Sequence, residues 1–272
     1  MSDNERTDQF TLLDEAAGGR DLTVRDDQNV FQEFLDAVKV CRRSRGRFRL
    51  LDTGHFSLYE LEWLGEAGAD IYTSDEARPD KAQVDFLVQA CARGDALVAY
   101  FHYGEIGGGA EGSEKSSLEF LKDIGRSRAF IHLTNREMPR EIPGLGELAH
   151  VCKKAGTRLV YYHQGQPEDG LVTLARSGAW IHLSDQSLEP GEESLLLVDL
   201  VREAAAAGGG LILHVERGLH VPFLREILKA GAYLLVETPP SDYRSPSRLL
   251  ERKARRRVPD FRSYYLYASF LP

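Results

Sequence analysis

Short apolar runs alternate with longer segments of helical periodicity through most of the chain. The runs are rich in β-branched and aromatic residues, and the segments between them carry apolar residues at helical spacing, which predicts repeated strand–helix units and a parallel sheet. Eight such units are the number that closes a TIM-type (β/α)8 barrel, and this is the fold class we predict. The eight predicted strands are 48–54, 69–75, 97–104, 129–135, 158–165, 179–185, 210–216 and 232–238.

An open doubly wound sheet is the alternative architecture. Its dinucleotide-binding members carry GxGxxG in the first strand-to-helix turn. The first predicted turn here reads DTGHFS from Asp52 and lacks that fingerprint. The barrel is therefore the preferred prediction.

The predicted strands also carry an internal repeat. Every second strand begins with alanine, at Ala69, Ala129, Ala179 and Ala232, with spacings of 60, 50 and 53 residues, and three of these strands read ADIYTSD, AFIHLTN and AWIHLSD. Such a period can also indicate a solenoid or a propeller. Each copy here mixes strands with helices, so the repeat indicates a barrel built from four copies of a two-strand unit.

The two ends of the chain differ from the barrel and from each other. Residues 1–28 are acidic and show no sustained period, so we expect a mobile segment outside the core. Residues 29–272 are predicted to form one barrel domain, and the helical pattern at 29–45, ahead of the first predicted strand, would plug its bottom. The barrel domain would end in the basic segment 244–262 and an aromatic run.

Composition limits the partners. The net charge is −8, so nucleic acid is an unlikely partner. The hydrophobic fraction of 42% is ordinary for a globular protein, and no apolar run is long enough for a membrane span. The first residues lack a secretory pattern, which favours the cytoplasm. Three widely spaced cysteines, at Cys41, Cys91 and Cys152, are predicted to be reduced and structural.

One predicted ring of side chains has the composition of a metal site. Each odd-numbered predicted strand reaches a glycine, and counting back two residues places four side chains in one interior layer near the C-terminal mouth, namely Asp52, His102, His163 and Glu216. Two imidazoles and two carboxylates suit Zn²⁺, Mn²⁺ or Fe²⁺. A purely hydrogen-bonded polar layer is the alternative.

A second interior layer is predicted from the even-numbered strands. Tyr72, His132 and His182 would point inward. His214 lies two residues before Glu216 on the same face of the seventh strand, as a further candidate ligand or proton-transfer group. One step nearer the mouth the even-numbered strands carry Ser74, Thr134, Ser184 and Glu237. Six of the eight histidines lie on or at the ends of predicted strands, which favours a catalytic or metal-binding role for the group.

These layers predict a metal-dependent enzyme, most plausibly a hydrolase acting on a small molecule. The metal would activate water, His132, His182 or His214 would carry protons, and the even-strand hydroxyls would orient the substrate. A lyase or an isomerase would use the same groups. No lysine falls on a predicted strand, which disfavours a Schiff-base aldolase. The alternative from another class is a non-catalytic scaffold that binds a partner through Arg252–Arg257.

Overall fold

The computed structural model describes residues 9–104, 106, 117–136, 142–188, 195–215 and 221–236. These residues form two compact units. The first unit contains the described residues up to Gly104 together with Ser127–Ala129, and the second contains those of Glu105–Arg126 and of Phe130–Arg262.

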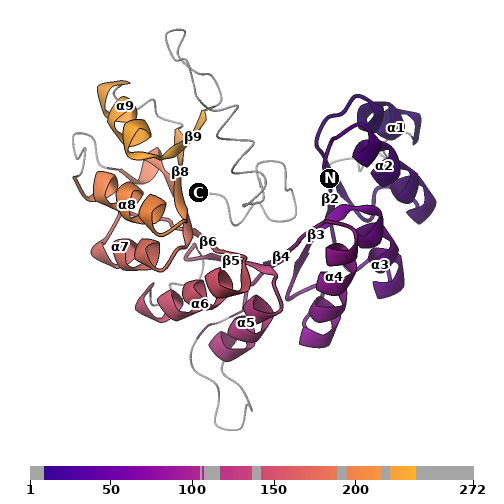
Figure 1. Cartoon of the computed structure of the whole chain (residues 1–272), viewed down its shortest axis with the longest axis horizontal. Helices are drawn as coiled ribbons and strands as arrows, with labels where there is room; N and C mark the ends of the chain where they lie inside the picture. The colour runs from indigo at the N-terminus through magenta and orange to yellow at the C-terminus, as the bar shows by residue number, and fades with distance from the viewer. Residues whose placement is uncertain are drawn as a thin grey trace. The chain divides into compact units, whose positions relative to one another are not determined.

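In the first unit, strands and helices alternate along the chain (Figure 1). The strands β1 to β4 are parallel and pair in chain order. The elements are α1 (Gln9–Ala17), β1 (Leu22–Arg25), α2 (Phe31–Arg43), β2 (Phe48–Leu51), α3 (Leu58–Ala67), β3 (Ala69–Ser74), α4 (Lys81–Arg93) and β4 (Val98–Phe101).

The second unit repeats this organisation with parallel strands β5 to β9 in chain order. Its elements are α5 (Ser117–Arg126), β5 (Phe130–Thr134), α6 (Ile142–Ala155), β6 (Leu159–Tyr162), α7 (Asp169–Arg176), β7 (Trp180–Ser184), the short 3-10 helix η1 (Asp185–Ser187), α8 (Leu195–Ala206), β8 (Gly210–Val215), α9 (Val221–Ala230) and β9 (Tyr233–Val236). In each unit the helices lie along one face of the strands (Figure 1).

The predicted fold class is confirmed: the chain is an α/β protein of the (β/α)8 TIM-barrel type, with parallel strands in chain order and helices between them. All eight predicted strands are present, β2 to β9. In β2 to β8 every residue is buried, on both faces, which explains why these strands read as continuous apolar runs rather than as alternating ones. The extent of the barrel domain, 29–272, stays a prediction.

The structure differs from the sequence prediction in residues 1–28. Helix α1 and strand β1 lie there, and Leu12, Ala16, Leu22 and Val24 are buried in the core. Both elements are too short to show a sustained hydrophobic period, since β1 has four residues and α1 has nine.

The extra strand also changes the role of α2. This helix follows β1 and precedes β2, so it is the crossover of a parallel β–α–β unit rather than a plug below the first strand. Phe34 of α2 packs edge-on against Phe48 of β2, with ring centroids 6.0 Å apart. The face of β2 that carries Phe48 is therefore the helix-covered face.

Local sequence explains where α3 begins and ends. Ser57 accepts a hydrogen bond from the Glu60 amide, and the Glu60 carboxylate accepts one in return from the Ser57 amide, which is a capping box. The helix ends at Gly68, whose φ of 112° belongs to the left-handed region that glycine adopts without strain. These signals hold the loop after β2 at a defined position.

The three cysteines are free and buried, as predicted. Burial raises the pKa of the Cys41 thiol to about 11 and that of Cys152 to about 12, so both are protonated at neutral pH. No helix in the described part of the chain is long and apolar enough to span a membrane.

Candidate functional site: a buried histidine cluster

The strand register places the two predicted interior layers on opposite faces of the sheet. In the first unit, Tyr72 pairs with Leu51, so Asp52, one residue further, lies on the other face with Phe48. In the second unit, Tyr162 pairs with His182, and His163 therefore faces away from His182. The prediction that both layers point into one interior is wrong.

The cause is the glycine used to set the register. Side chains alternate only while the backbone is extended. β2 ends at Leu51, and Gly54 lies in the following turn with a φ of 88°. Counting back from such a glycine crosses a turn, so it does not report which face a strand residue occupies.

Asp52 lies at the C-terminal end of β2 and is held by an arginine. Arg78 donates from Nε to one Asp52 oxygen at 2.8 Å and from Nη2 to the other at 2.9 Å. The Thr73 hydroxyl and the Gly54 amide donate to the same carboxylate, so each oxygen accepts two hydrogen bonds. Asp52 is fully buried, and this bidentate pairing satisfies its charge.

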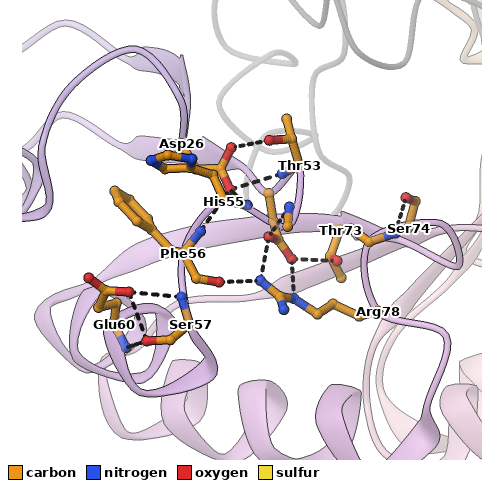
Figure 2. A network of polar contacts seen from close by, with 12 residues as sticks. Asp26, Thr53, His55, Phe56, Ser57, Glu60, Thr73, Ser74 and Arg78 are labelled. Carbon is orange, nitrogen blue, oxygen red and sulfur yellow. Dashed lines mark hydrogen bonds and ion pairs between the residues drawn. The ribbon is translucent and has the colours of Figure 1, made fainter.

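Asp26, at the end of β1, fastens the loop that follows β2. Its carboxylate accepts hydrogen bonds from the Thr53 hydroxyl and amide and from the amides of His55 and Phe56 (Figure 2). Burial raises the pKa of Asp26, although the hydrogen bonds from Thr53 act in the opposite direction. Arg78 also donates to the Phe56 carbonyl at 2.6 Å, so the same loop is tied from two sides.

His102, at the end of β4, pairs with Asp75 at the end of β3. The distance from His102 Nδ1 to Asp75 Oδ2 is 2.8 Å, and the amides of Tyr103 and Gly104 donate to the same carboxylate. Burial acts to raise the pKa of Asp75, but His102 and these amides outweigh it and lower that pKa. A Cβ on Gly104 would meet the His102 ring at 2.9 Å, so a larger residue there would have to displace that ring.

The remaining predicted metal ligands are His163 and Glu216. His163 Nε2 contacts the Gln166 carbonyl at 2.9 Å, and burial lowers the pKa of His163. Glu216 lies outside the described residues. Among the residues that the structure describes, no group of three or more His, Cys, Asp or Glu side chains is placed to hold a metal ion. The predicted Zn²⁺, Mn²⁺ or Fe²⁺ site stays a prediction.

The three histidines predicted to carry protons lie on one face of the second unit. His132 pairs with Val160, two residues before Tyr162, and His214 pairs with Ser184, two residues after His182. His182 Nδ1 lies 2.9 Å from His214 Nε2, which is a hydrogen bond between two imidazoles. The Tyr162 ring stacks on His182, with centroids 4.3 Å apart.

Burial keeps His132 and His182 uncharged. It lowers the pKa of His132 and of His182 well below the ordinary value of 6.5, and the nearby His214 and His132 lower that of His182 further. Both rings are therefore neutral at pH 7. A neutral imidazole has one N–H donor and one acceptor nitrogen, which is what proton transfer requires.

Aromatic packing and hydroxyl groups surround the histidines. Trp180 lies two residues before His182 on the same face and contacts Tyr233 of β9, with centroids 5.2 Å apart. Thr134 and Ser184 are the last residues of β5 and β7, and each lies two residues beyond a cluster histidine. Both hydroxyls accept local amide hydrogen bonds, from Arg136 and Gln186 respectively.

Sequence reasoning missed several partners of the predicted residues, namely Arg78, Asp75 and Tyr162. A signal for Asp75 was present, because it ends the repeated motif ADIYTSD, where the second copy has Asn135. Asn135 accepts from the Gln164 amide at 2.6 Å and donates to the Gln164 carbonyl at 2.8 Å, so it ties the next loop as Asp75 does. Arg78 lies in a loop and carries no such signal.

Other predicted residues lie outside the described part of the chain. These are Glu237 of the second layer and the basic segment 244–262, including Arg252–Arg257. The scaffold alternative therefore stays a prediction.

No protein-family model matches the chain, and no curated protein matches it. Among solved structures, the chain is similar to a deoxyribose phosphate aldolase from Aeropyrum pernix, described as tetrameric, with 11% identity over 83% of this chain and 91% of that chain and a TM-score of 0.35. It is also similar to a putative fructose-1,6-biphosphate aldolase from Coccidioides immitis, with 13% identity over 75% of this chain and 79% of that chain and a TM-score of 0.36. Values this low carry no conclusion about activity, and the site has to be interpreted from its own chemistry.

Proposed function

We propose that this chain is an enzyme that transfers a proton to or from a small-molecule substrate through the His182–His214 pair. The observation that carries the proposal is the 2.9 Å contact between His182 Nδ1 and His214 Nε2. Because His182 is neutral, one of these two nitrogens holds the proton and the other accepts it. A proton that arrives at the outer nitrogen of one ring can then leave from the outer nitrogen of the other.

The surroundings of the pair support this role. Stacking on Tyr162 fixes the plane of His182, so the hydrogen bond to His214 keeps its direction. Thr134 and Ser184 add hydroxyl groups beside the histidines, where they could orient a polar substrate.

Hydrolysis is the reaction class that we put first. A relay that accepts a proton from an attacking water and returns it to the leaving group meets the needs of a hydrolase. A lyase or an isomerase would use the same pair to remove a proton from carbon. The metal site that the sequence predicts, with Asp52, His102, His163 and Glu216 as its ligands, remains a separate proposal and is not part of this relay, because His163 faces away from His182.

A substrate screen with matched variants tests the proposal. The full chain, purified without a histidine tag, is assayed on panels of small esters, amides, phosphoesters and hydroxycarbonyl compounds, alongside His182→Gln, His214→Gln and His150→Gln. His150 is an exposed histidine of α6 and serves as the control. We expect the first two variants to lose activity by about 100-fold or more and the control to keep it. Full activity in both cluster variants would remove the pair from the mechanism.

Elemental analysis of the same proteins tests the metal separately. Near-stoichiometric Zn, Mn or Fe in the parent, lost in His102→Ala and His163→Ala, is the expected result. Metal-free protein that binds none of these ions on addition would eliminate the metal but leave the histidine relay standing.

A further inference from the structure

The first unit contains a cavity of about 290 Å³ that the proposed function does not use. Its lining comes from the segments after β1 and β2 and from the first turns of α2 and α3, and comprises Asp27, Asn29, Val30, Phe31, His55, Phe56 and Glu60. It thus lies at the C-terminal ends of parallel strands, where α/β folds bind their ligands. The loop that forms one wall is held in place by Asp26 and Arg78 (Figure 2).

Aromatic rings form much of the cavity wall. Phe31 meets Phe56 edge to face at a centroid distance of 6.0 Å and contacts Trp63 at 5.9 Å. His55 lies 5.6 Å from Phe56. Trp63 is 58% exposed, which is unusual for so large an apolar side chain, and it extends this aromatic wall to the surface. The faces of such rings carry partial negative charge and attract cations.

The charged groups of the lining are carboxylates. Asp27 and Glu60 line the cavity, and none of the seven lining residues is lysine or arginine. Asp27 is already paired with Arg25 at 2.8 Å. Glu60 receives the Ser57 amide and hydroxyl on Oε2, while its Oε1 makes no hydrogen bond or ion pair with any described residue. One carboxylate oxygen therefore remains available to a ligand.

The two helix N-termini at the cavity would by themselves favour an anion. Both are already supplied with acceptors. Glu60 and Ser57 cap α3, and Glu33 accepts from the Val30 amide at the start of α2. The added negative charge of these carboxylates opposes a second anion and favours a cation.

From the rings and the open carboxylate we propose that this cavity binds an organic ammonium ion with a small apolar body. The ammonium group would lie against Glu60 and over the faces of the aromatic rings, and its methyl or methylene groups would contact Phe31 and Phe56. Choline is a suitable probe because it has this chemistry and because replacing its nitrogen by carbon gives a neutral molecule of the same shape, 3,3-dimethylbutan-1-ol.

Calorimetric titration of the full chain with the two probes tests the proposal. We expect choline to bind and its neutral analogue to bind about tenfold or more weakly, since only the charge differs. Equal affinities would show a merely apolar cavity, binding of inorganic phosphate in place of choline would show an anion site, and no choline binding at about 10 mM to folded protein would show no site. Each of these three results would overturn the proposal.

Variants assign the effect to the cavity. Glu60→Gln removes the charge but retains an oxygen for the Ser57 amide, and Phe31→Leu removes a ring but keeps apolar bulk. Each is expected to weaken choline binding about five- to tenfold. Glu62→Gln, on the same helix but outside the lining, should leave binding unchanged. His182→Gln should also leave it unchanged, because the cavity belongs to the first unit and does not depend on the proposed enzyme activity.

Discussion

The two units treat buried polar residues in opposite ways. In the first unit, carboxylates that follow the strands are paired with basic side chains, as Asp52 is with Arg78 and Asp75 with His102. In the second unit the corresponding residue is a neutral amide, Asn135, which is hydrogen-bonded to the Gln164 backbone. The buried face of that unit carries His132 and His182, whose pKa values are lowered. A buried ion pair holds geometry because breaking it leaves a charge uncompensated, whereas a neutral imidazole can exchange a proton. On our two proposals, the first unit would bind a ligand and the second would transfer protons.

The largest effect is expected from breaking the buried pair of the first unit. Asp52→Asn would leave the Arg78 guanidinium without its carboxylate and should lower the free energy of unfolding by about 3–5 kcal/mol. Urea unfolding measures this. Glu62→Gln, which disturbs the exposed pair with Arg93, is the control and should cost less than about 1 kcal/mol. Equal losses in the two variants would contradict a structural role for the Asp52 pair.

The close packing of the Trp180 ring against Gly210 in the second unit predicts a smaller loss of unfolding free energy. A Cβ at Gly210 would lie 2.6 Å from the Trp180 ring, so Gly210→Ala must displace the ring or the backbone and should cost about 1–3 kcal/mol. Gly144→Ala, in the first turn of α6 where no atom lies within 4 Å, is the control and should be neutral or stabilising by up to about 1 kcal/mol. If thermal melting ranks the two in the reverse order, the packing account of this face is wrong.

The histidines predict how stability changes with pH. Their folded pKa values lie below the unfolded value of 6.5, so the unfolded chain binds more protons below that pH. Stability is thus fully present above pH 6.5 and falls as the pH drops toward the folded pKa values, by about 1.4 kcal/mol per pH unit for each histidine.

His182→Gln should remove its share of this slope between pH 6.5 and 5.5. Asp26 and Asp70 have raised pKa values and act in the opposite direction, but they are unchanged in the variant and cancel in the difference. Urea midpoints across this range give the measurement. A variant that keeps the whole slope would show that folding does not lower the pKa of His182.

The smallest effect is expected at Asn135 of the second unit, whose neutral side chain is hydrogen-bonded to the Gln164 backbone. Asn135→Ala removes both hydrogen bonds to the Gln164 backbone and should cost about 1 kcal/mol, with faster hydrogen exchange at the Gln164 amide. Asn135→Asp keeps the acceptor and copies the arrangement of Asp75, so it should protect that amide better than alanine does. Equal exchange rates in both variants would mean that the tie contributes nothing.

Much of the fold followed from local patterns, and the site only in part. Each predicted strand from 48–54 onward was confirmed. These strands could be predicted because a parallel strand that is buried on both faces has a continuous apolar sequence. His182 and His214 were predicted on the same strands that bring them together. Asp52 and His102 were assigned to the wrong face, because alternation across a turn glycine carries no information about register. Arg78 could not be identified, since its partner lies 26 residues earlier in the chain.

By itself, the sequence determined the (β/α) organisation and the residues that could carry chemistry, because periodicity and residue type are local properties of the chain. Only the tertiary structure decided which of them meet. The pairing between strands decided on which face each side chain lies, and burial decided that His182 is neutral. The pairing of β1 with β2 made α2 a crossover helix and brought Asp26 within hydrogen-bonding distance of Thr53. Those outcomes depend on contacts between residues far apart in the chain, which no local pattern records.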